Sequence, residues 1–235
     1  AKGVCDRLGV NYIFKSSYDK VNRSSVKSYR GPGLAEGVRI LKKVRATFGC
    51  PTLTDFHSAE EAEPAAEGAD ILQVPAFLVR QTDVVAAGGR TGRVINVKKG
   101  QFMAPWDMQN VCEKLEEVGN SRITLTERGA TFGYGNLIVD PRSFYELKKF
   151  GYPVVFDATH SVQLPGGLGH TTDGKREYIY PQAKAAIGAG IDGLFIETHP
   201  DVDHALSDKT NQLPLEYFEP LLARLKALHE VARDL

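Results

Sequence analysis

The sequence has no excess charge of either sign and no long apolar run. It contains 29 Lys and Arg residues against 29 Asp and Glu residues, so its formal net charge is +0. Because no global field attracts a polyanion or an anionic membrane surface, we expect neither nucleic acid nor membrane as a partner. No stretch approaches the roughly 18 apolar residues that span a bilayer. The opening residues also lack the basic-then-apolar order of a secretory signal.

Cysteine is scarce as well. Cys5, Cys50 and Cys112 are odd in number, far apart in the chain and form no Cys-x-x-Cys pair. This pattern does not suggest a disulfide framework, and we expect three reduced thiols that serve packing. Reduced thiols are typical of the cytosol, so we predict a cytoplasmic protein.

What the sequence does contain is an alternation of short β-branched runs with helical patterns. Near-continuous apolar strands that alternate with helices indicate an α/β protein with a parallel sheet covered by helices. The predicted strands span 11–17, 51–56, 71–76, 93–99, 123–129, 154–160 and 194–199. The predicted helices span 33–49, 58–68, 77–89, 105–119, 140–151 and 180–190, with an amphipathic helix in the tail at 213–235.

A chain of 235 residues with 42% apolar content suits one barrel domain over residues 1–235. A (β/α)₈ TIM barrel needs eight strands, and only seven are predicted. Residues 1–9 have the pattern of a helix that leads into the first predicted strand, which implies an earlier strand before Ala1. Our preferred hypothesis is a TIM barrel whose first strand is missing from this chain. Whether the chain is active without that strand stays open. The alternative is an open sheet.

Polar residues mark the carboxyl end of every predicted strand. In a barrel these ends meet at one mouth, where active sites are built. One polar residue at a strand end is most often merely solvated, but seven such ends indicate a site. The residues are Lys15 and Ser16, Asp55, Gln73 with Pro75, Lys98 and Lys99, Glu127 and Arg128, Asp157 and His160, and Glu197 and His199.

Five of the cationic side chains at or near this mouth form one candidate group. Clustered cations repel one another unless an anion lies between them, and Arg and Lys both bind phosphate and carboxylate groups. We therefore predict a site for phosphorylated small molecules, with a solvated basic loop as the alternative for residues 22–33. The cations are Lys15, Lys98 and Arg128 at strand ends, and Lys20 and Arg23 in the loop DKVNRSS.

His160, Glu197 and Asp208 form a second candidate group. One imidazole with two carboxylates is a ligand set for zinc, iron or manganese. The same groups can instead move protons by hydrogen bonding, without a metal. Asp208 lies in the acidic loop DVDHALSDKTNQ. A single histidine at a strand end is more often structural, so the metal role, the acid–base role and the structural role all stay open.

Seven motifs, in order, resemble those of 3-deoxy-D-manno-octulosonate 8-phosphate synthases. They are FKSSYDKVNRSS, TDFHS, QVPAFLVRQTD, NVKKGQF, TERGATFGYGNLIVD, FDATHSVQLPGG and IETHPDVDHALSD. The resemblance implies a (β/α)₈ barrel, a homotetramer and a transferase of lipopolysaccharide biosynthesis. It also implies the reaction, which condenses phosphoenolpyruvate with D-arabinose 5-phosphate and water.

The resemblance implies roles for particular residues. The residues expected to bind phosphoenolpyruvate are Lys15, Asp55, Gln73, Ala76, Lys98 and Arg128. Those expected to bind arabinose 5-phosphate are Lys20, Asn22, Arg23 and Ser24, with Phe77 and Arg80 reaching a neighbouring subunit's sugar phosphate. The expected catalytic residues are His160, Lys20, Glu197 and Asp208.

In the metal-dependent branch of these enzymes, His160, Glu197 and Asp208 would be three of four metal ligands. The fourth is a cysteine at the end of the first strand, which is not in this chain, and Cys5 lies too early to be that residue. A metal-independent branch has asparagine there. The residues SDKTNQ resemble the metal-dependent branch. The resemblance therefore implies a divalent cofactor, zinc, iron or manganese.

Three alternative functions stay open. The sister enzyme, 3-deoxy-D-arabino-heptulosonate 7-phosphate synthase, uses erythrose 4-phosphate and typically has a KPRTS-like loop where this chain has KVNRSS. A Schiff-base aldolase would use the amine of Lys15, Lys98 or Lys99. A non-catalytic phosphate-binding barrel would bind phosphoenolpyruvate without turnover.

Overall fold

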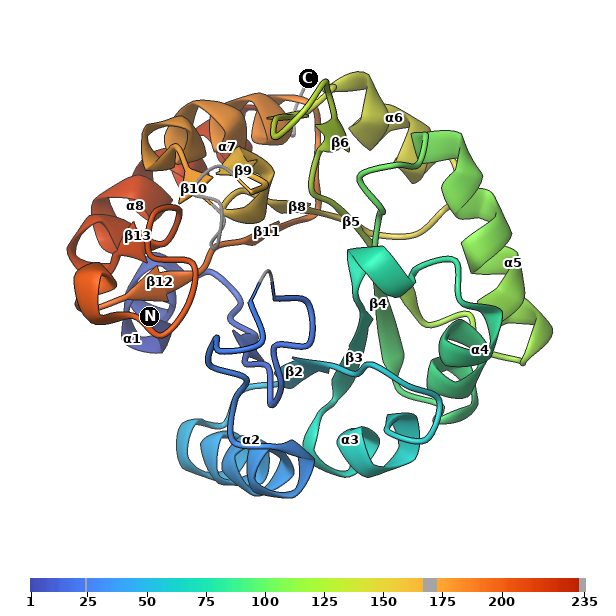
Figure 1. The fold of residues 1–235 in the computed structure, drawn as a ribbon. Coiled ribbons are helices and arrows are strands. Elements are labelled where there is room, and N and C mark those ends of the chain that lie inside the picture. The colour runs from blue at the N-terminus through green and yellow to red at the C-terminus, as the bar shows by residue number, and fades with distance from the viewer. Residues whose placement is uncertain (24, 167–172, 233–235) are drawn as a thin grey trace. The chain divides into compact units, whose positions relative to one another are not determined.

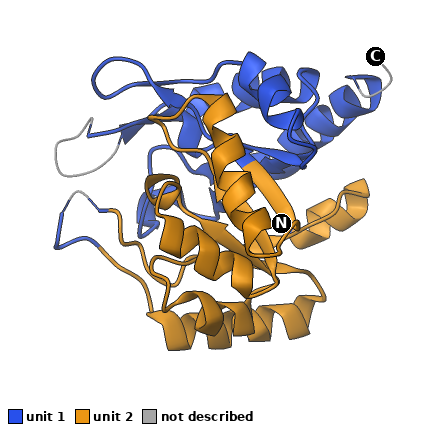
Figure 2. Cartoon of the chain, turned by 90° about the vertical axis from the view of Figure 1, so that its right-hand side faces the viewer, with its two compact units in different colours: residues 1, 23–28, 126–235 blue, residues 2–22, 29–125 orange. Residues whose placement is uncertain are grey.

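The computed structural model describes residues 1–23, 25–166 and 173–232 (Figure 1). Contacts between residues divide the chain into two compact units, coloured separately in Figure 2. Unit 2 comprises Lys2–Asn22 and Tyr29–Leu125, and unit 1 comprises Ala1, Arg23–Ser28 and Thr126–Leu235. Each unit has its own strands, its own helices and its own buried apolar side chains.

Seven strands follow one another in the order β1-β2-β3-β4-β5-β8-β11. The pairs β1–β2, β2–β3, β3–β4 and β8–β11 are parallel. The seven predicted strands and the α/β class are therefore confirmed, although each strand is shorter than predicted. A closed barrel with an eighth strand stays a prediction. The strands are β1 (Phe14–Lys15), β2 (Thr52–Asp55), β3 (Ile71–Val74), β4 (Val94–Lys98), β5 (Ile123–Glu127), β8 (Val154–Asp157) and β11 (Gly193–Phe195).

Unit 2 has its helices along one side of its strands (Figure 1). Val74, Ile95 and Leu115 are fully buried between these layers, because the strands carry apolar residues without a polar alternation. The helices are α1 (Lys2–Leu8), α2 (Leu34–Phe48), α3 (Ala62–Gly68), α4 (Thr82–Arg90) and α5 (Gln109–Glu117), with 3₁₀ turns η1 (Ala76–Leu78) and η2 (Pro105–Met108).

The loop after β1 is held against helix α2 by a close approach at Gly37. A Cβ atom on Gly37 would lie 2.3 Å from Cβ of Tyr18, closer than packed atoms come. Tyr18 is buried, and its carbonyl accepts a hydrogen bond from the backbone N of Gly33 at 3.0 Å. Only glycine lets the helix and the loop meet here, and this contact fixes the segment that carries Lys15 and Ser17.

Unit 1 places its helices outside β8 and β11 (Figure 1). Phe144 of α6 and Phe156 of β8 pack edge to face with ring centroids 5.4 Å apart, and both are buried. No helix in the described part of the chain is both long and apolar enough to cross a membrane. The helices are α6 (Arg142–Lys148), α7 (Ile179–Gly188) and α8 (Phe218–Ala232), with 3₁₀ turns η3 (His160–Val162), η4 (Arg176–Tyr178), η5 (Val202–His204) and η6 (Leu215–Tyr217).

Three small two-stranded ladders in unit 1 were not predicted. One of them shortens a predicted strand, because Thr198 and His199 pair with β13 and not with the seven-stranded sheet. The strand predicted over 194–199 is wrong in its second half, since β11 ends at Phe195. The ladders are β6 (Ala130–Thr131) with β7 (Leu137–Ile138), β9 (Gln163–Leu164) with β10 (Asp173–Gly174), and β12 (Thr198–His199) with β13 (Leu213–Pro214).

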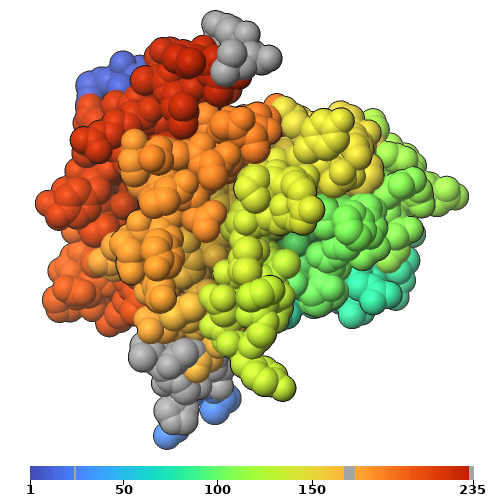
Figure 3. All heavy atoms as spheres, turned by 90° about the horizontal axis from the view of Figure 1, so that it is seen from above, coloured from blue at the N-terminus to red at the C-terminus, as the bar shows by residue number. Residues whose placement is uncertain are grey.

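The surface carries several large aromatic side chains. Tyr134 and Phe132, in the β6–β7 hairpin, are exposed. A yellow-green segment projects from the surface in Figure 3. In unit 2, Phe77, Phe102 and Trp106 are each more than half exposed, at 53%, 56% and 63%. Large exposed apolar side chains mark a contact surface where they form one contiguous patch.

Candidate active site

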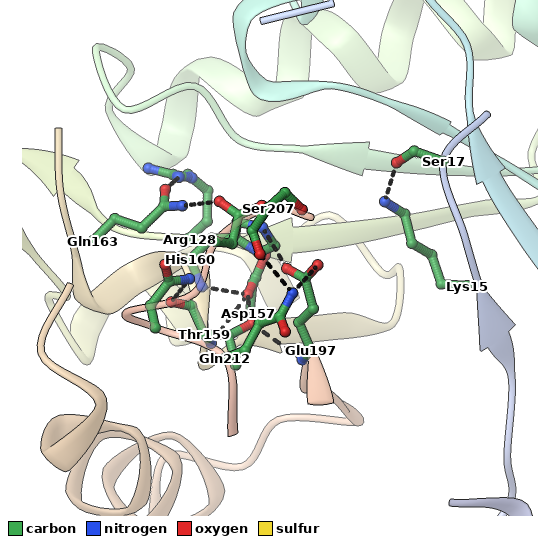
Figure 4. A network of polar contacts seen from close by, with 12 residues as sticks. Lys15, Ser17, Arg128, Asp157, Thr159, His160, Gln163, Glu197, Ser207 and Gln212 are labelled. Atoms are coloured by element: carbon green, nitrogen blue, oxygen red, sulfur yellow. Dashed lines mark hydrogen bonds and ion pairs between the residues drawn. The ribbon is translucent and has the colours of Figure 1, made fainter. Parts of the chain in front are cut away.

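Asp157 organises the segment that follows β8 in unit 1. It is fully buried, and its Oδ1 accepts hydrogen bonds from the backbone N of Thr159 at 3.2 Å and of His160 at 2.9 Å. Its Oδ2 lies 2.8 Å from Nδ1 of His160 (Figure 4). A carboxylate against Nδ1 holds the ring proton there, which leaves Nε2 of His160 available as a base or a ligand.

Glu197 and Asp208 join His160 in one small region. Nε2 of His160 lies 3.2 Å from Oε2 of Glu197, and one ligand atom from each of the three residues lies within 4.8 Å of the others. The backbone N of Glu197 donates to Oγ1 of Thr159 at 3.2 Å. Asp208 has a φ of 53°, and no other non-glycine residue in the described ranges has a positive φ. Strain of this kind is often found at functional sites.

The carboxylates of Glu197 and Asp208, like the imidazole of His160, each have a hydrogen-bond partner that orients them. Nε2 of Gln212 donates to Oε1 of Glu197 at 3.1 Å, and Nε2 of Gln163 donates to Oδ1 of Asp208 at 3.1 Å. Partners of this kind orient metal ligands and hold them in place. One imidazole and two oriented carboxylates therefore fit a divalent cation.

Arg128 follows β5 directly and is buried in unit 1. Its Nη2 donates to Oε1 of Gln163 at 2.9 Å, but the buried Nη1 has no hydrogen-bond partner in the described part of the chain. Burial lowers the pKa of Arg128, while Asp157, Glu127 and Asp208 oppose that shift. Because arginine stays charged in proteins, a buried donor left over on it favours an anion bound at this place.

In unit 2, Lys15 and Asp55 meet at the ends of two paired strands. Nζ of Lys15 lies 3.2 Å from Oδ1 of Asp55 and donates to Oγ of Ser17 at 2.8 Å. The Ser17 hydroxyl in turn donates to Oδ1 of Asp55 at 2.5 Å. Nε2 of His57 lies 3.0 Å from the other oxygen, Oδ2. The adjacent parallel strands β1 and β2 bring these groups together.

His57 is held from its other side by Glu61. Oε2 of Glu61 accepts hydrogen bonds from the backbone N of His57 at 2.9 Å and from the hydroxyl of Tyr18 at 2.8 Å. The Tyr18 and His57 rings meet edge to face, with centroids 5.3 Å apart. Burial and then the bond to Glu61 raise the pKa of Tyr18, so this hydroxyl stays a neutral donor. Sequence reasoning missed Ser17, His57 and Glu61, although TDFHS placed His57 two residues after Asp55.

The contacts of Asp55 predict how the stability of the fold changes in acid. Burial opposes its ionisation, but Lys15, His57 and Ser17 together hold the pKa of its carboxyl well below the usual 3.8. This stabilisation is complete above the unfolded-state pKa and is lost as the pH falls through the folded-state pKa. We expect Asp55→Asn to be less stable than the wild type at pH 6, with a difference that shrinks toward pH 2. Urea unfolding across this range measures the difference, and one that stays constant would contradict the assignment.

The remaining strand-end residues of unit 2 are an amide pair and two lysines. Nε2 of Gln73 donates to Oδ1 of Asn96 at 2.7 Å, a pair set by the register of β3 and β4. Lys98 ends β4 and is largely buried. Nζ of Lys99 donates to the carbonyls of Gly100 and Met103, at 3.3 Å each. The amine of Lys99 therefore serves its own loop, which disfavours it as a Schiff-base nucleophile.

The residues expected at the sugar phosphate lie mainly in the loop after β1. Lys20 and Asn22 belong to unit 2, and Arg23 is grouped with unit 1. Nε and Nη2 of Arg23 are buried and have no hydrogen-bond partner within residues 1–23, 25–166 and 173–232. A guanidinium in this condition is suited to an anionic ligand. Ser24 lies outside the described residues.

The motif PAFLVRQTD forms the turn between β3 and α4. Ala76 is buried at the start of η1, whereas Phe77 and Arg80 are exposed. The backbone N of Leu78 donates to the carbonyl of Pro75 at 2.9 Å, which closes this turn. Ala76 thus lies next to the end of β3, and the other two side chains point to the surface.

Residues 1–233 match the DAHP synthetase I family. The chain belongs to this family. The match extends through both units.

Curated relatives of this family member are similar over nearly its whole length. A protein of Trichlorobacter lovleyi is 56% identical over 230 residues, which are 98% of this chain and 85% of the relative. A protein of Geobacter sulfurreducens is 55% identical over 230 residues with the same coverage. A protein of Fusobacterium nucleatum is 55% identical over 221 residues, 94% of this chain and 80% of the relative. Each of the three is named 2-dehydro-3-deoxyphosphooctonate aldolase.

Proposed function

We propose that the chain condenses phosphoenolpyruvate with D-arabinose 5-phosphate and water. The products are 3-deoxy-D-manno-octulosonate 8-phosphate and inorganic phosphate, and the reaction serves lipopolysaccharide precursor synthesis. The observation that carries this proposal is the identity of about 55% to 2-dehydro-3-deoxyphosphooctonate aldolases over 98% of the chain. The buried guanidinium of Arg128 supports it, because its unused Nη1 suits an anionic substrate.

Phosphoenolpyruvate is held, in this proposal, by cations at the strand ends. Each charge-assisted hydrogen bond to its phosphate or carboxylate contributes about 1.5–3 kcal/mol. Asp55 keeps Lys15 oriented through its contact at 3.2 Å, and Ser17 donates into the same carboxylate. The binding residues are Lys15, Asp55, Gln73, Ala76, Lys98 and Arg128.

Arabinose 5-phosphate is held by the loop after β1. The buried Nε and Nη2 of Arg23 support this placement, since they suit a phosphate. Phe77 and Arg80 are exposed and would reach the sugar phosphate of a neighbouring subunit. The binding residues are Lys20, Asn22, Arg23, Ser24, Phe77 and Arg80.

The reaction forms one carbon–carbon bond and one carbon–oxygen bond, and it breaks the carbon–oxygen bond that joins carbon 2 to the phosphate. Carbon 3 of phosphoenolpyruvate attacks the aldehyde, whose oxygen gains a proton from Lys20. Water adds at carbon 2 and loses a proton to Nε2 of His160. Phosphate then leaves with the bridging oxygen and takes up the remaining proton of the new hydroxyl, so that carbon 2 becomes the ketone. Holding two reactants in register supplies at most about 7–11 kcal/mol of the rate acceleration.

His160, Glu197 and Asp208 would hold a divalent cation such as zinc, iron or manganese. When bound, such a cation lowers the pKa of a nearby water molecule. Asp157 keeps the proton on Nδ1 of His160, so that Nε2 can accept one or bind the cation. Gln212 and Gln163 hold the two carboxylates in their orientations.

We also propose that the enzyme works in the cytoplasm as a homotetramer. The substrates are small phosphorylated metabolites, and the three cysteines are free and buried. Exposed aromatic residues, among them Phe102 and Trp106, support association between copies of the chain. Light scattering after size-exclusion chromatography measures the assembly, and a monomeric mass at micromolar concentration would contradict it.

The choice of sugar tests the proposed function directly. We expect kcat/KM for arabinose 5-phosphate to exceed that for erythrose 4-phosphate by about a hundredfold, because a site built for one sugar phosphate leaves polar groups unpaired with the shorter one. Phosphate release from phosphoenolpyruvate, measured with each sugar side by side, gives both values. A preference for the four-carbon sugar would identify the sister enzyme. Borohydride with both substrates should trap no adduct, whereas a covalent adduct would identify a Schiff-base aldolase.

A further inference from the structure

Gln163 lies between the candidate anion site and the candidate cation site of unit 1. Its Oε1 accepts the hydrogen bond from Nη2 of Arg128 at 2.9 Å (Figure 4). Its Nε2 donates to Oδ1 of Asp208 at 3.1 Å. The oxygen and the nitrogen of this one amide thus each form a hydrogen bond to a charged group. Reversing the amide would set its NH₂ against a guanidinium and its oxygen against a carboxylate, so the two partners fix its orientation.

The backbone also ties Gln163 to His160. The backbone N of Gln163 donates to the carbonyl of His160 at the end of η3, and Gln163 then pairs with Gly174 in the β9–β10 ladder. The side chain is largely buried, so it has little freedom to leave this position. One short segment therefore carries both the imidazole and the amide.

The amide keeps the charges on its two sides apart. Asp208 acts electrostatically on Arg128, yet the guanidinium donates to the neutral amide of Gln163. Nη1 of Arg128 consequently has no hydrogen-bond partner in the described chain and can meet an anion. Oδ1 of Asp208 receives the other end of the amide, which orients this carboxylate beside His160 and Glu197.

We infer that Gln163 is a positioning residue that couples the binding of phosphoenolpyruvate at Arg128 to the binding of a divalent cation at His160, Glu197 and Asp208. This inference rests on the proposed function. An anion bound to the guanidinium of Arg128 fixes the position of that group and, through it, the amide of Gln163. The amide then keeps the carboxylate of Asp208 in the orientation that binds the cation. Because such coupling is reciprocal, a cation at Asp208 favours the anion to the same degree.

Gln163→Met tests the inference, since methionine is similar in length and makes neither hydrogen bond. We expect Mn²⁺ binding, followed without substrate by the EPR signal of free Mn²⁺, to weaken about tenfold to a hundredfold. We expect phosphoenolpyruvate binding, measured by calorimetry in metal-free buffer, to weaken about tenfold, because a guanidinium that has lost its partner must be ordered by the ligand. The factor by which phosphoenolpyruvate tightens Mn²⁺ binding should also be smaller than in the wild type.

Asn120→Leu is the matched control, because Asn120 is also a buried amide that uses both its nitrogen and its oxygen. Its Nδ2 donates to the carbonyls of Gly89 and Arg93, and its Oδ1 accepts from the backbone N of Arg122, at 2.9 Å each and all in unit 2. This variant should lose stability but keep both affinities within about twofold, since its partners are ordinary backbone groups. If Gln163→Met does not fold, Gln163→Asn keeps the amide on a shorter side chain that cannot reach both partners, and the same losses are expected.

The outcomes separate the inference from the proposed function. Wild-type turnover of phosphoenolpyruvate and arabinose 5-phosphate is measured on the same preparation, and its absence would reject the proposed function. An active wild type whose Gln163→Met variant keeps both affinities and the coupling would reject only the inference. A wild type that binds no Mn²⁺, or binds it equally with and without phosphoenolpyruvate, would also overturn the coupling.

Discussion

Replacing Arg128 by methionine is expected to lower kcat/KM for phosphoenolpyruvate by about a hundredfold to ten-thousandfold, mainly through KM. The reason is the loss of about two charge-assisted hydrogen bonds, each contributing about 1.5–3 kcal/mol. Nη1 of Arg128 is a buried donor that the described chain does not use, so an anionic substrate is its natural partner. Initial rates of phosphate release at varied phosphoenolpyruvate measure the effect.

Arg128→Lys is the informative companion to this variant. It keeps the positive charge but loses the planar fork, so we expect an intermediate loss of kcat/KM. It also separates substrate binding from folding, because methionine leaves Glu127, Asp157 and Asp208 without the charge that faces them. Urea unfolding of the wild type and of both Arg128 variants measures the loss of folding stability separately. A methionine variant that folds and keeps kcat/KM within threefold of the wild type would remove Arg128 from the site.

Replacing His160 by alanine is expected to lower kcat by about a hundredfold to ten-thousandfold, the usual contribution of a positioned acid or base. The variant removes Nε2, which lies 3.2 Å from Glu197, and leaves the buried Asp157 without the ring that it orients. Since Arg128 is not changed, the KM for phosphoenolpyruvate should move much less than kcat. The two variants therefore have opposite kinetic signatures.

His204→Ala is the matched control for His160→Ala. His204 also lies in unit 1 and also pairs with an aspartate through Nδ1, at 2.7 Å from Asp201, but it is exposed. Its removal should leave kcat unchanged, because an exposed ion pair contributes little. Treating the wild type with a chelator then separates the two chemical roles of His160. Loss of activity indicates the metal route, and retained activity together with an inactive His160→Ala variant indicates acid–base catalysis alone.

The fold could be predicted because it depends on patterns that are local in the chain. Runs such as 93–99 and 123–129 are apolar and β-branched, and helical patterns between them leave a parallel sheet as the arrangement that buries both. The strand ends could also be predicted, since parallel strands in sequence bring their carboxyl ends to one edge. Lys15 and Asp55 meet for that reason.

The hydrogen-bond partners within the site could not be predicted in the same way. Gln163 and Gln212 lie in segments whose path depends on the β9–β10 and β12–β13 ladders, which have only two residues in each strand. Glu61 reaches His57 because the chain after β2 bends back on itself, and nothing in the spacing requires that. Ladders this short have no periodic signature, so their residues do not stand out in a sequence.

The amino-acid order alone thus determined the class of fold, the strand ends that carry charged residues and the family to which the motifs point. These depend on periodicity and on residue chemistry, both of which are written along the chain. Only the tertiary structure decided that Gln163 stands between Arg128 and Asp208, and that Asp157 holds the ring of His160. Hydrogen bonds require atoms to meet within a few tenths of an ångström, and that precision arises only when the packed backbone has placed the side chains.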